Sequence, residues 1–221
     1  MPVYKKVNKN FFKKWTPEMA YVLGFFAADG YLTFNKRGAY YWCIQITDKA
    51  LLEKIKRAVQ ATHKISLRPK RQNESQLYRL QIGSKTMFYD LQKLGFTPWK
   101  TKNLVLPHVP RKYLPHFVRG YFDGDGNVWI GLIHKNRKKN TLALLTAFTS
   151  CSRSFLINLH ARLKKVGLCG GSLVFYRTFC RLQYSIEDSL HLALFMYQSI
   201  PHGLYLNRKK AIFDKFKRMR A

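Results

Sequence analysis

Two segments of this chain, residues 22–30 and 118–126, repeat one pattern that constrains the fold more than any other feature. Each is an apolar, helix-like stretch that ends in an aspartate followed by a glycine. Each carries two small residues four apart: Gly24 with Ala28, and Gly120 with Gly124. Residues at this spacing share one side of a helix, and small ones let a second backbone approach closely. The repeat therefore predicts two helices packed through these small residues.

The aspartates that end the two segments, Asp29 and Asp125, stand where a helix disfavours negative charge. The last turn of a helix carries the negative end of its dipole, so a carboxylate there is repelled. Two such carboxylates at the ends of paired helices predict a cation between them. The glycines that follow, Gly30 and Gly126, predict a left-handed backbone at each helix end.

The chain is strongly basic, with 40 Lys and Arg against 11 Asp and Glu and a net charge of +29 over 221 residues. Such an excess predicts a nucleic-acid partner. The longest near-apolar run, residues 19–28, is too short to span a bilayer, which excludes a membrane-spanning role. Four cysteines without metal-site spacing indicate reduced thiols in a soluble intracellular protein. Bacterial cytoplasm and organelle matrix both stay open.

Elements of the same order occur in both halves of the chain, so we expect two copies of an αββαββα unit. In the first copy we expect a helix over 17–29, strands over 30–35 and 39–47, a helix capped by Asp48, strands over 64–70 and 76–82, and a helix over 84–94. The second predicts a helix over 115–125, strands over 127–133 and 142–149, a helix capped by Ser152, strands over 172–176 and 181–186, and a helix over 190–197. The predicted domains are residues 1–106 and 115–221, joined by a linker at 107–114. The fold class is α+β, with two antiparallel sheets.

Alternation along the strands predicts one apolar and one polar face for each sheet. Arg79 and Gln81 oppose Leu80, and the same triplet recurs with Arg181 and Gln183. Arginine and glutamine read base edges in a major groove, so these faces are candidate DNA-reading surfaces. A solvated basic face is the alternative.

At the two aspartate motifs the chain resembles the LAGLIDADG homing endonuclease family in its monomeric, two-repeat form. The resemblance implies helices that interlock at a pseudo-dyad and sheets that straddle DNA as a saddle. It also implies that Asp29 and Asp125 bind divalent metal with the carbonyls of Ala28 and Gly124. Mg²⁺ is the expected ion, with Ca²⁺ or Mn²⁺ as substitutes in vitro. The implied activity is a double-strand break with short 3′ overhangs in a long asymmetric duplex.

Three further residues are catalytic candidates by the same resemblance. Asp48 follows the second strand, near where relatives place a polar residue beside the attacking water; a plain helix cap is the alternative. Lys100 and Lys209 stand at similar points of the two units and are candidates for a basic residue near the scissile phosphate. Phosphate positioning or simple solvation is the alternative for both. Asp123 has no acidic counterpart in the first motif, so we expect an interface or hydrogen-bonding role for it.

The candidate DNA-binding residues lie on the polar strand faces and on the loop over 134–140. They are Tyr31, Thr33, Asn35, Arg37, Gln45, Lys64, Ser66, Arg68, Lys70, Arg79, Gln81, Asn127, Trp129, Lys135, Arg137, Lys138, Lys139, Tyr176, Arg177, Arg181 and Gln183.

A second hypothesis is an RNA maturase with intron RNA as partner, or a non-catalytic DNA-binding protein on the same fold. Both motif aspartates are present, which favours the nuclease. A ribosome-like basic protein is a third alternative, and it does not account for paired acidic helices. The residues predict neither the target sequence nor the gene context (intron, intein or free-standing).

Overall fold

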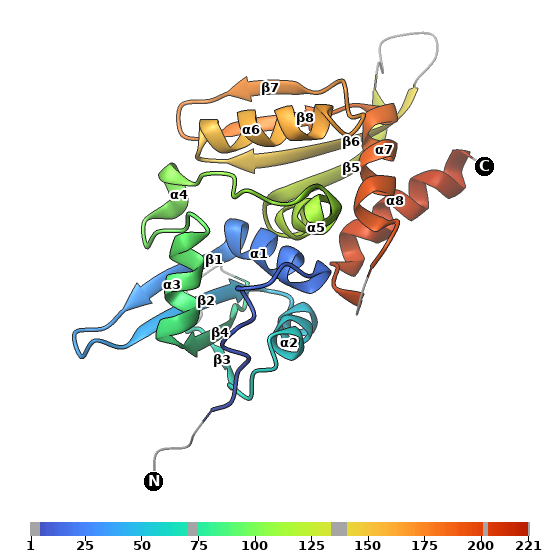
Figure 1. Ribbon diagram of the computed structural model, residues 1–221. Helices are drawn as coiled ribbons and strands as arrows, with labels where there is room; N and C mark the ends of the chain where they lie inside the picture. The colour runs from blue at the N-terminus through green and yellow to red at the C-terminus, as the bar shows by residue number, and fades with distance from the viewer. Residues whose placement is uncertain (1–4, 70–74, 134–140, 201–202, 221) are drawn as a thin grey trace.

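The computed structural model describes residues 5–69, 75–133, 141–200 and 203–220, which form two similar halves (Figure 1). The first half comprises α1 (Pro17–Asp29), β1 (Gly30–Phe34), β2 (Tyr40–Ile46), α2 (Lys49–Ala58), β3 (Ile65–Leu67), β4 (Tyr78–Gly83), α3 (Lys85–Lys93) and α4 (Lys100–Asn103). After a 3₁₀ turn (Arg111–Tyr113), the second comprises α5 (Leu114–Asp125), β5 (Gly126–Ile133), β6 (Thr141–Ser150), α6 (Arg153–Lys164), β7 (Ser172–Phe175), β8 (Cys180–Tyr184), α7 (Ile186–Tyr197) and α8 (Asn207–Arg220).

Each half builds one antiparallel four-stranded sheet, in the orders β1-β2-β4-β3 and β5-β6-β8-β7. Helices α1 and α5 lie side by side between the two sheets (Figure 1). The predicted fold class, with two αββαββα units and paired central helices, is confirmed. The structure adds α8, a helix that the strand and helix pattern did not predict.

The two central helices touch backbone to backbone at the predicted small residues. A Cβ atom added to Gly24 would lie 2.0 Å from the carbonyl oxygen of Phe117. A Cβ atom added to Gly120 would lie 2.1 Å from the carbonyl oxygen of Tyr21. No side chain fits at either position without separating the helices, so the predicted role of the small residues is confirmed.

The prediction for the glycines that follow the aspartates is wrong. Gly30 and Gly126 have φ of −88° and ψ of 160° and 158°, an extended backbone that carries each helix directly into a strand. Glycine is needed there for space instead: a Cβ at Gly30 would lie 2.0 Å from the Phe26 ring, and one at Gly126 would lie 2.3 Å from the Phe122 ring. The phenylalanine one turn earlier thus fills the volume in which a side chain would stand.

Helix caps and apolar stripes position the outer helices as the sequence predicts. The Asp48 carboxylate accepts a hydrogen bond from the Leu51 amide at 2.8 Å and begins α2. The Ser152 hydroxyl accepts from the Phe155 amide at 3.3 Å and begins α6. The helices cover one face of each sheet, where Leu80 and Leu182 are buried. The other faces carry the polar side chains discussed below. No helix of the described residues is long and apolar enough to cross a membrane.

We expect the substitution Gly120→Ala to lower the free energy of unfolding by about 1–3 kcal/mol, since its Cβ would overlap the α1 backbone. Urea unfolding of the wild type and the variant measures this cost. Gly83→Ala is the matched control, because its nearest atom is Tyr41 Cε1 at 3.2 Å, in a side chain that can move. An equal loss in the two variants would contradict the tight helix contact.

Candidate metal and nucleic-acid site

The acidic ends of α1 and α5 meet at the centre of the molecule. Asp29 and Asp125 are both partly buried and end the two paired helices. Gly124 leaves room for the opposing carboxylate: a Cβ there would lie 2.3 Å from the Ala28 Cβ and 3.1 Å from Asp29 Oδ2. The two motif ends therefore adjoin, as the resemblance implies.

A buried lysine from α8 reaches the same place. Lys209 is 3% exposed, and its ammonium donates to carbonyl oxygens at the end of α5: Phe122 at 2.6 Å, Asp123 at 2.8 Å, Gly124 at 3.3 Å and Gly126 at 2.6 Å. Burial lowers the pKa of Lys209 to about 8, against an opposing effect of the carboxylates of Asp123, Asp29 and Asp125. A positive charge there also offsets the negative end of the helix dipole. The protein thus supplies part of the cationic charge that the two aspartates require.

Asp123 anchors the segment that leads into α8. It is 2% exposed, and its Oδ2 accepts from the Tyr21 hydroxyl at 2.8 Å and from the Leu206 amide at 2.9 Å. Burial raises its pKa to about 6, and the hydrogen bond from Tyr21 opposes this shift. The predicted interface role of Asp123 is confirmed: it joins α1, α5 and the residue before α8.

Arg119, which the sequence patterns did not single out, holds the end of α7 and the residues just before α8. Its side chain is fully buried; its Nε donates to the Leu204 carbonyl at 2.9 Å, and its Nη1 donates to the carbonyls of Met196 at 2.6 Å and Ser199 at 3.1 Å. Its Nη2 lies 3.2 Å from His116 Nδ1, and burial lowers the pKa of that histidine to about 4, so His116 stays neutral and accepts. A buried charge with this many partners fixes α7 and the 203–206 segment on α5.

The donor set suits a hard divalent cation. Two carboxylates and the C-terminal backbone of two helices converge, and Mg²⁺ is commonly held by one or two carboxylates with several waters retained. Within the described residues, no group of three or more His, Cys, Asp or Glu side chains forms a cluster. A softer metal that needs imidazole or thiolate ligands therefore has no matching cluster there.

The remaining catalytic candidates are Asp48, Lys100 and Lys209. The Asp48 carboxylate caps α2, which is the alternative stated for it. Lys100 begins the short α4, and its side chain lies outside the described residues. Lys209 is at the predicted centre, but its ammonium faces backbone carbonyls, so it is a positioning residue in this structure.

The polar sheet faces place most of the predicted DNA-binding residues together. On the first sheet, the Gln45 amide donates to the Tyr31 hydroxyl at 2.7 Å, and Arg79 and Gln81 are half-buried beside them. On the second sheet, the positions facing the same way are Asn127, Trp129, Thr149, Arg181 and Gln183. Of the other candidates, three are half-buried: Thr33, Ser66 and Arg68. Four are exposed on loops or edge strands: Arg37, Lys64, Tyr176 and Arg177. The remaining five lie outside the described residues: Lys70, Lys135, Arg137, Lys138 and Lys139.

Asn35, one of the predicted DNA-binding residues, has a structural role. The Asn35 side-chain oxygen accepts from the amides of Arg37 at 3.0 Å and Ala39 at 2.9 Å. It therefore closes the β1–β2 turn, and this oxygen is not free to accept from a base.

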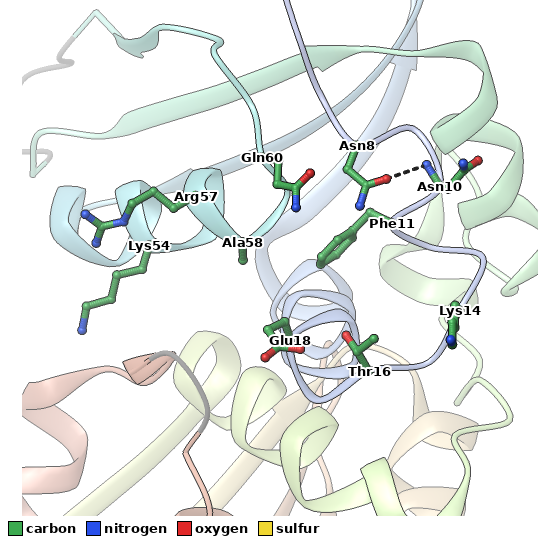
Figure 2. A pocket seen from close by; sticks show the side chains of 10 residues that line it. All are labelled: Asn8, Asn10, Phe11, Lys14, Thr16, Glu18, Lys54, Arg57, Ala58 and Gln60. Atoms are coloured by element: carbon green, nitrogen blue, oxygen red, sulfur yellow. Dashed lines mark hydrogen bonds between the residues drawn. The ribbon is translucent and has the colours of Figure 1, made fainter.

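One pocket lies away from this centre. It measures about 790 Å³ and lies between residues 8–18 and α2, with Asn8, Phe11 and Glu18 on one side and Lys54 and Arg57 on the other (Figure 2). It is at the start of α1, whereas Asp29 ends this helix, roughly 18 Å away at 1.5 Å per residue. The pocket contributes nothing to the acidic centre.

Comparisons with known proteins agree with this geometry. Residues 16–94 match the family model described as a LAGLIDADG-like domain. An uncharacterized protein of Methanocaldococcus jannaschii is 27% identical over 119 residues, which cover 51% of this chain. The match covers 40% of that protein, so the chain spans less than half the length of this relative.

Two solved structures have similar folds over most of this chain. The LAGLIDADG meganuclease I-AabMI, bound to uncleaved DNA, has a TM-score of 0.63 at 16% identity and covers 93% of this chain and 90% of its own. The I-LtrWI LAGLIDADG homing endonuclease, bound to target DNA, has a TM-score of 0.60 at 13% identity, covering 96% and 92%. The resemblance inferred from the motifs is confirmed: residues 16–94 match a LAGLIDADG-like domain, and most of the chain has the LAGLIDADG meganuclease fold.

We expect Lys209→Met to lower the free energy of unfolding by about 2–3 kcal/mol, because the carbonyls at the end of α5 lose their charged donor. Thermal or urea unfolding measures this. Lys210→Met is the matched control: its ammonium pairs with Asp214 at 2.7 Å on a partly exposed face, and its loss costs at most about 0.5 kcal/mol. A Lys209 variant as stable as the Lys210 variant would contradict the capping role.

Proposed function

We propose that this protein is a site-specific DNA endonuclease that hydrolyses both strands of a long asymmetric duplex with a divalent metal. The observation that carries the proposal is the convergence of Asp29 and Asp125 at the ends of two helices in backbone contact. The base-reading side chains on both sheets and the net charge of +29 support a duplex DNA partner. The DNA-bound solved structures of similar fold are consistent with this partner.

Each residue of the centre has a distinct role in this proposal. Asp29 and Asp125, with the carbonyls of Ala28 and Gly124, would hold the metal, for which Mg²⁺ is the best fit. A divalent metal supplies an activated water and neutralises charge on the phosphate and the leaving oxygen. Lys209 fixes the end of α5 and keeps positive charge beside the two carboxylates. One aspartate from each repeat accounts for one cut in each strand, with short 3′ overhangs.

The remaining expectations extend this proposal. The two repeats in one chain favour a monomer whose internal pseudo-dyad replaces that of a dimer. The target is intracellular DNA, in a bacterial cytoplasm or an organelle matrix. Intron RNA is the alternative partner, with the maturase role that was inferred from the resemblance.

We expect the protein with Mg²⁺ to cleave a minority of a randomised pool of long duplexes at one shared sequence, and to leave the pool intact in EDTA. Sequencing of the cleaved ends gives the site and the overhang. Binding of structured RNA in place of duplex DNA, with no cleavage in any divalent metal, would contradict the nuclease and support the maturase.

We expect Asp29→Asn and Asp125→Asn each to lower the cleavage rate by at least about 100-fold, because each removes a charged metal ligand. Gel-shift binding to the selected duplex in Ca²⁺ should remain within about tenfold of the wild type, which separates loss of chemistry from loss of folding. Asp214→Asn is the matched control, since this acid pairs with Lys210 on the surface of α8. Full activity in either motif variant would contradict the assigned metal role.

A further inference from the structure

The strands pair in the same way within each of the two sheets, so each residue on the open face of the first sheet has an equivalent on the second. Gly30 pairs with Ile44 on the first sheet, and Gly126 pairs with Phe148 on the second. Counted from these pairs, the matched positions are Tyr31 and Asn127, Thr33 and Trp129, Tyr41 and Leu145, Cys43 and Ala147, and Gln45 and Thr149.

The inner strands carry the same two side chains at matched positions. Gln81 pairs with Cys43 and Gln183 pairs with Ala147, so Arg79 matches Arg181. Both arginines are half-buried, and each has a buried Nε for which the described residues provide no hydrogen-bond partner. Their stems are thus held in similar surroundings on the two sheets. Both repeats present the arginine and glutamine that hydrogen-bond to guanine and adenine.

The first two strands of the two sheets differ in chemistry. On β1 and β2 the open face presents hydroxyl and amide groups, and Gln45 is already oriented by its hydrogen bond to Tyr31. The second face presents a hollow of about 360 Å³ with an apolar floor and a polar rim. Its lining residues are Asn127, Trp129, Leu145, Thr146, Ala147, Arg181 and Gln183.

The apolar part of this hollow is formed by Trp129, Leu145 and Ala147. Trp129 is 44% exposed, and a Cβ on Gly131 would lie 2.0 Å from its Cζ2. The indole therefore lies over Gly131, along the sheet. Leu145 is the strand partner of Trp129, and Ala147 is buried beside Gln183. The indole Nε1–H is the one hydrogen-bond donor among these three side chains, and none of them carries an acceptor, so their contact with a base is mainly apolar.

We propose that the second sheet recognises thymine through its 5-methyl group in this hollow, whereas the first sheet reads its half-site by hydrogen bonds. The thymine methyl is the apolar group that a base pair projects into the major groove. Arg181 and Gln183 at the rim bring the hollow against base edges in the same groove. The inference rests on the proposed function, because it specifies which bases the DNA-reading face contacts.

The test compares thymine with uracil, which lacks only the methyl group. A bound target is first selected from a randomised duplex pool with the wild-type protein. The half-site read by the second repeat is the one whose consensus changes in Arg181→Ala and not in Arg79→Ala. The selected duplex is then synthesised with deoxyuridine in place of thymidine in one half-site at a time, and the dissociation constants are measured in Ca²⁺.

We expect uracil in the second half-site to weaken binding by roughly fourfold for each buried methyl, and uracil in the first half-site to change it less than twofold. Leu145→Asn should bind the thymine and uracil duplexes within twofold of each other. The matched control is Leu132→Asn, at an exposed leucine of β5 on the opposite face of the strand, and it should keep the wild-type preference.

Equal effects of uracil in both half-sites, no effect in either, or a second half-site without thymine would overturn the inference and leave the endonuclease proposal intact. Failure of the wild-type protein to bind any duplex of the pool would overturn the proposed function itself. The two failures are therefore distinguishable.

Discussion

The backbone contact between α1 and α5 is the constraint on which the rest of the structure depends. Gly24 and Gly120 bring each helix against a carbonyl of the other, and Gly124 admits the carboxylate of Asp29. Since a strand follows each helix at once, the same contact fixes the origin of both sheets. This one helix contact therefore fixes the positions of the acidic centre and of the two polar sheet faces. Larger side chains at Gly24 or Gly120 would displace all three together.

The repeats are alike in topology and unlike in buried chemistry. Where the first motif has Leu23 and Ala27, the second has Arg119 and Asp123, and both polar side chains hold the segment that leads into α8. That helix delivers Lys209 to the end of α5. Buried charges with one partner removed are strongly destabilising, so these groups form a unit. The centre is therefore supported from the second repeat by the network of Arg119, Asp123 and Lys209.

Local signals in the sequence predicted much of the fold. The small residues of the two motifs predicted the helix contact, Asp48 and Ser152 predicted helix starts, and alternation around Arg79 predicted the polar sheet face. The left-handed glycine prediction failed because Gly30 and Gly126 are required by the rings of Phe26 and Phe122, a packing constraint that adjacent residues do not reveal.

The supporting network could not be predicted, because its partners are far apart in the chain. Lys209 and Lys210 are neighbours of the same type, yet one is buried against carbonyls and the other pairs with Asp214. The resemblance singled out Lys209, but its burial against these carbonyls follows only from the fold. Nothing in the sequence around Arg119 or Tyr21 marks either residue as special. Their partners, Leu204 and Asp123, are distant in the chain and meet them only in the folded structure.

The most direct test of the account is a crystal structure of the protein with its selected duplex and Mn²⁺, in which anomalous scattering locates the metal. We expect metal peaks between the carboxylates of Asp29 and Asp125 and the DNA phosphates nearest the ends of α1 and α5. Metal bound only elsewhere, or phosphates that approach a different surface, would contradict it.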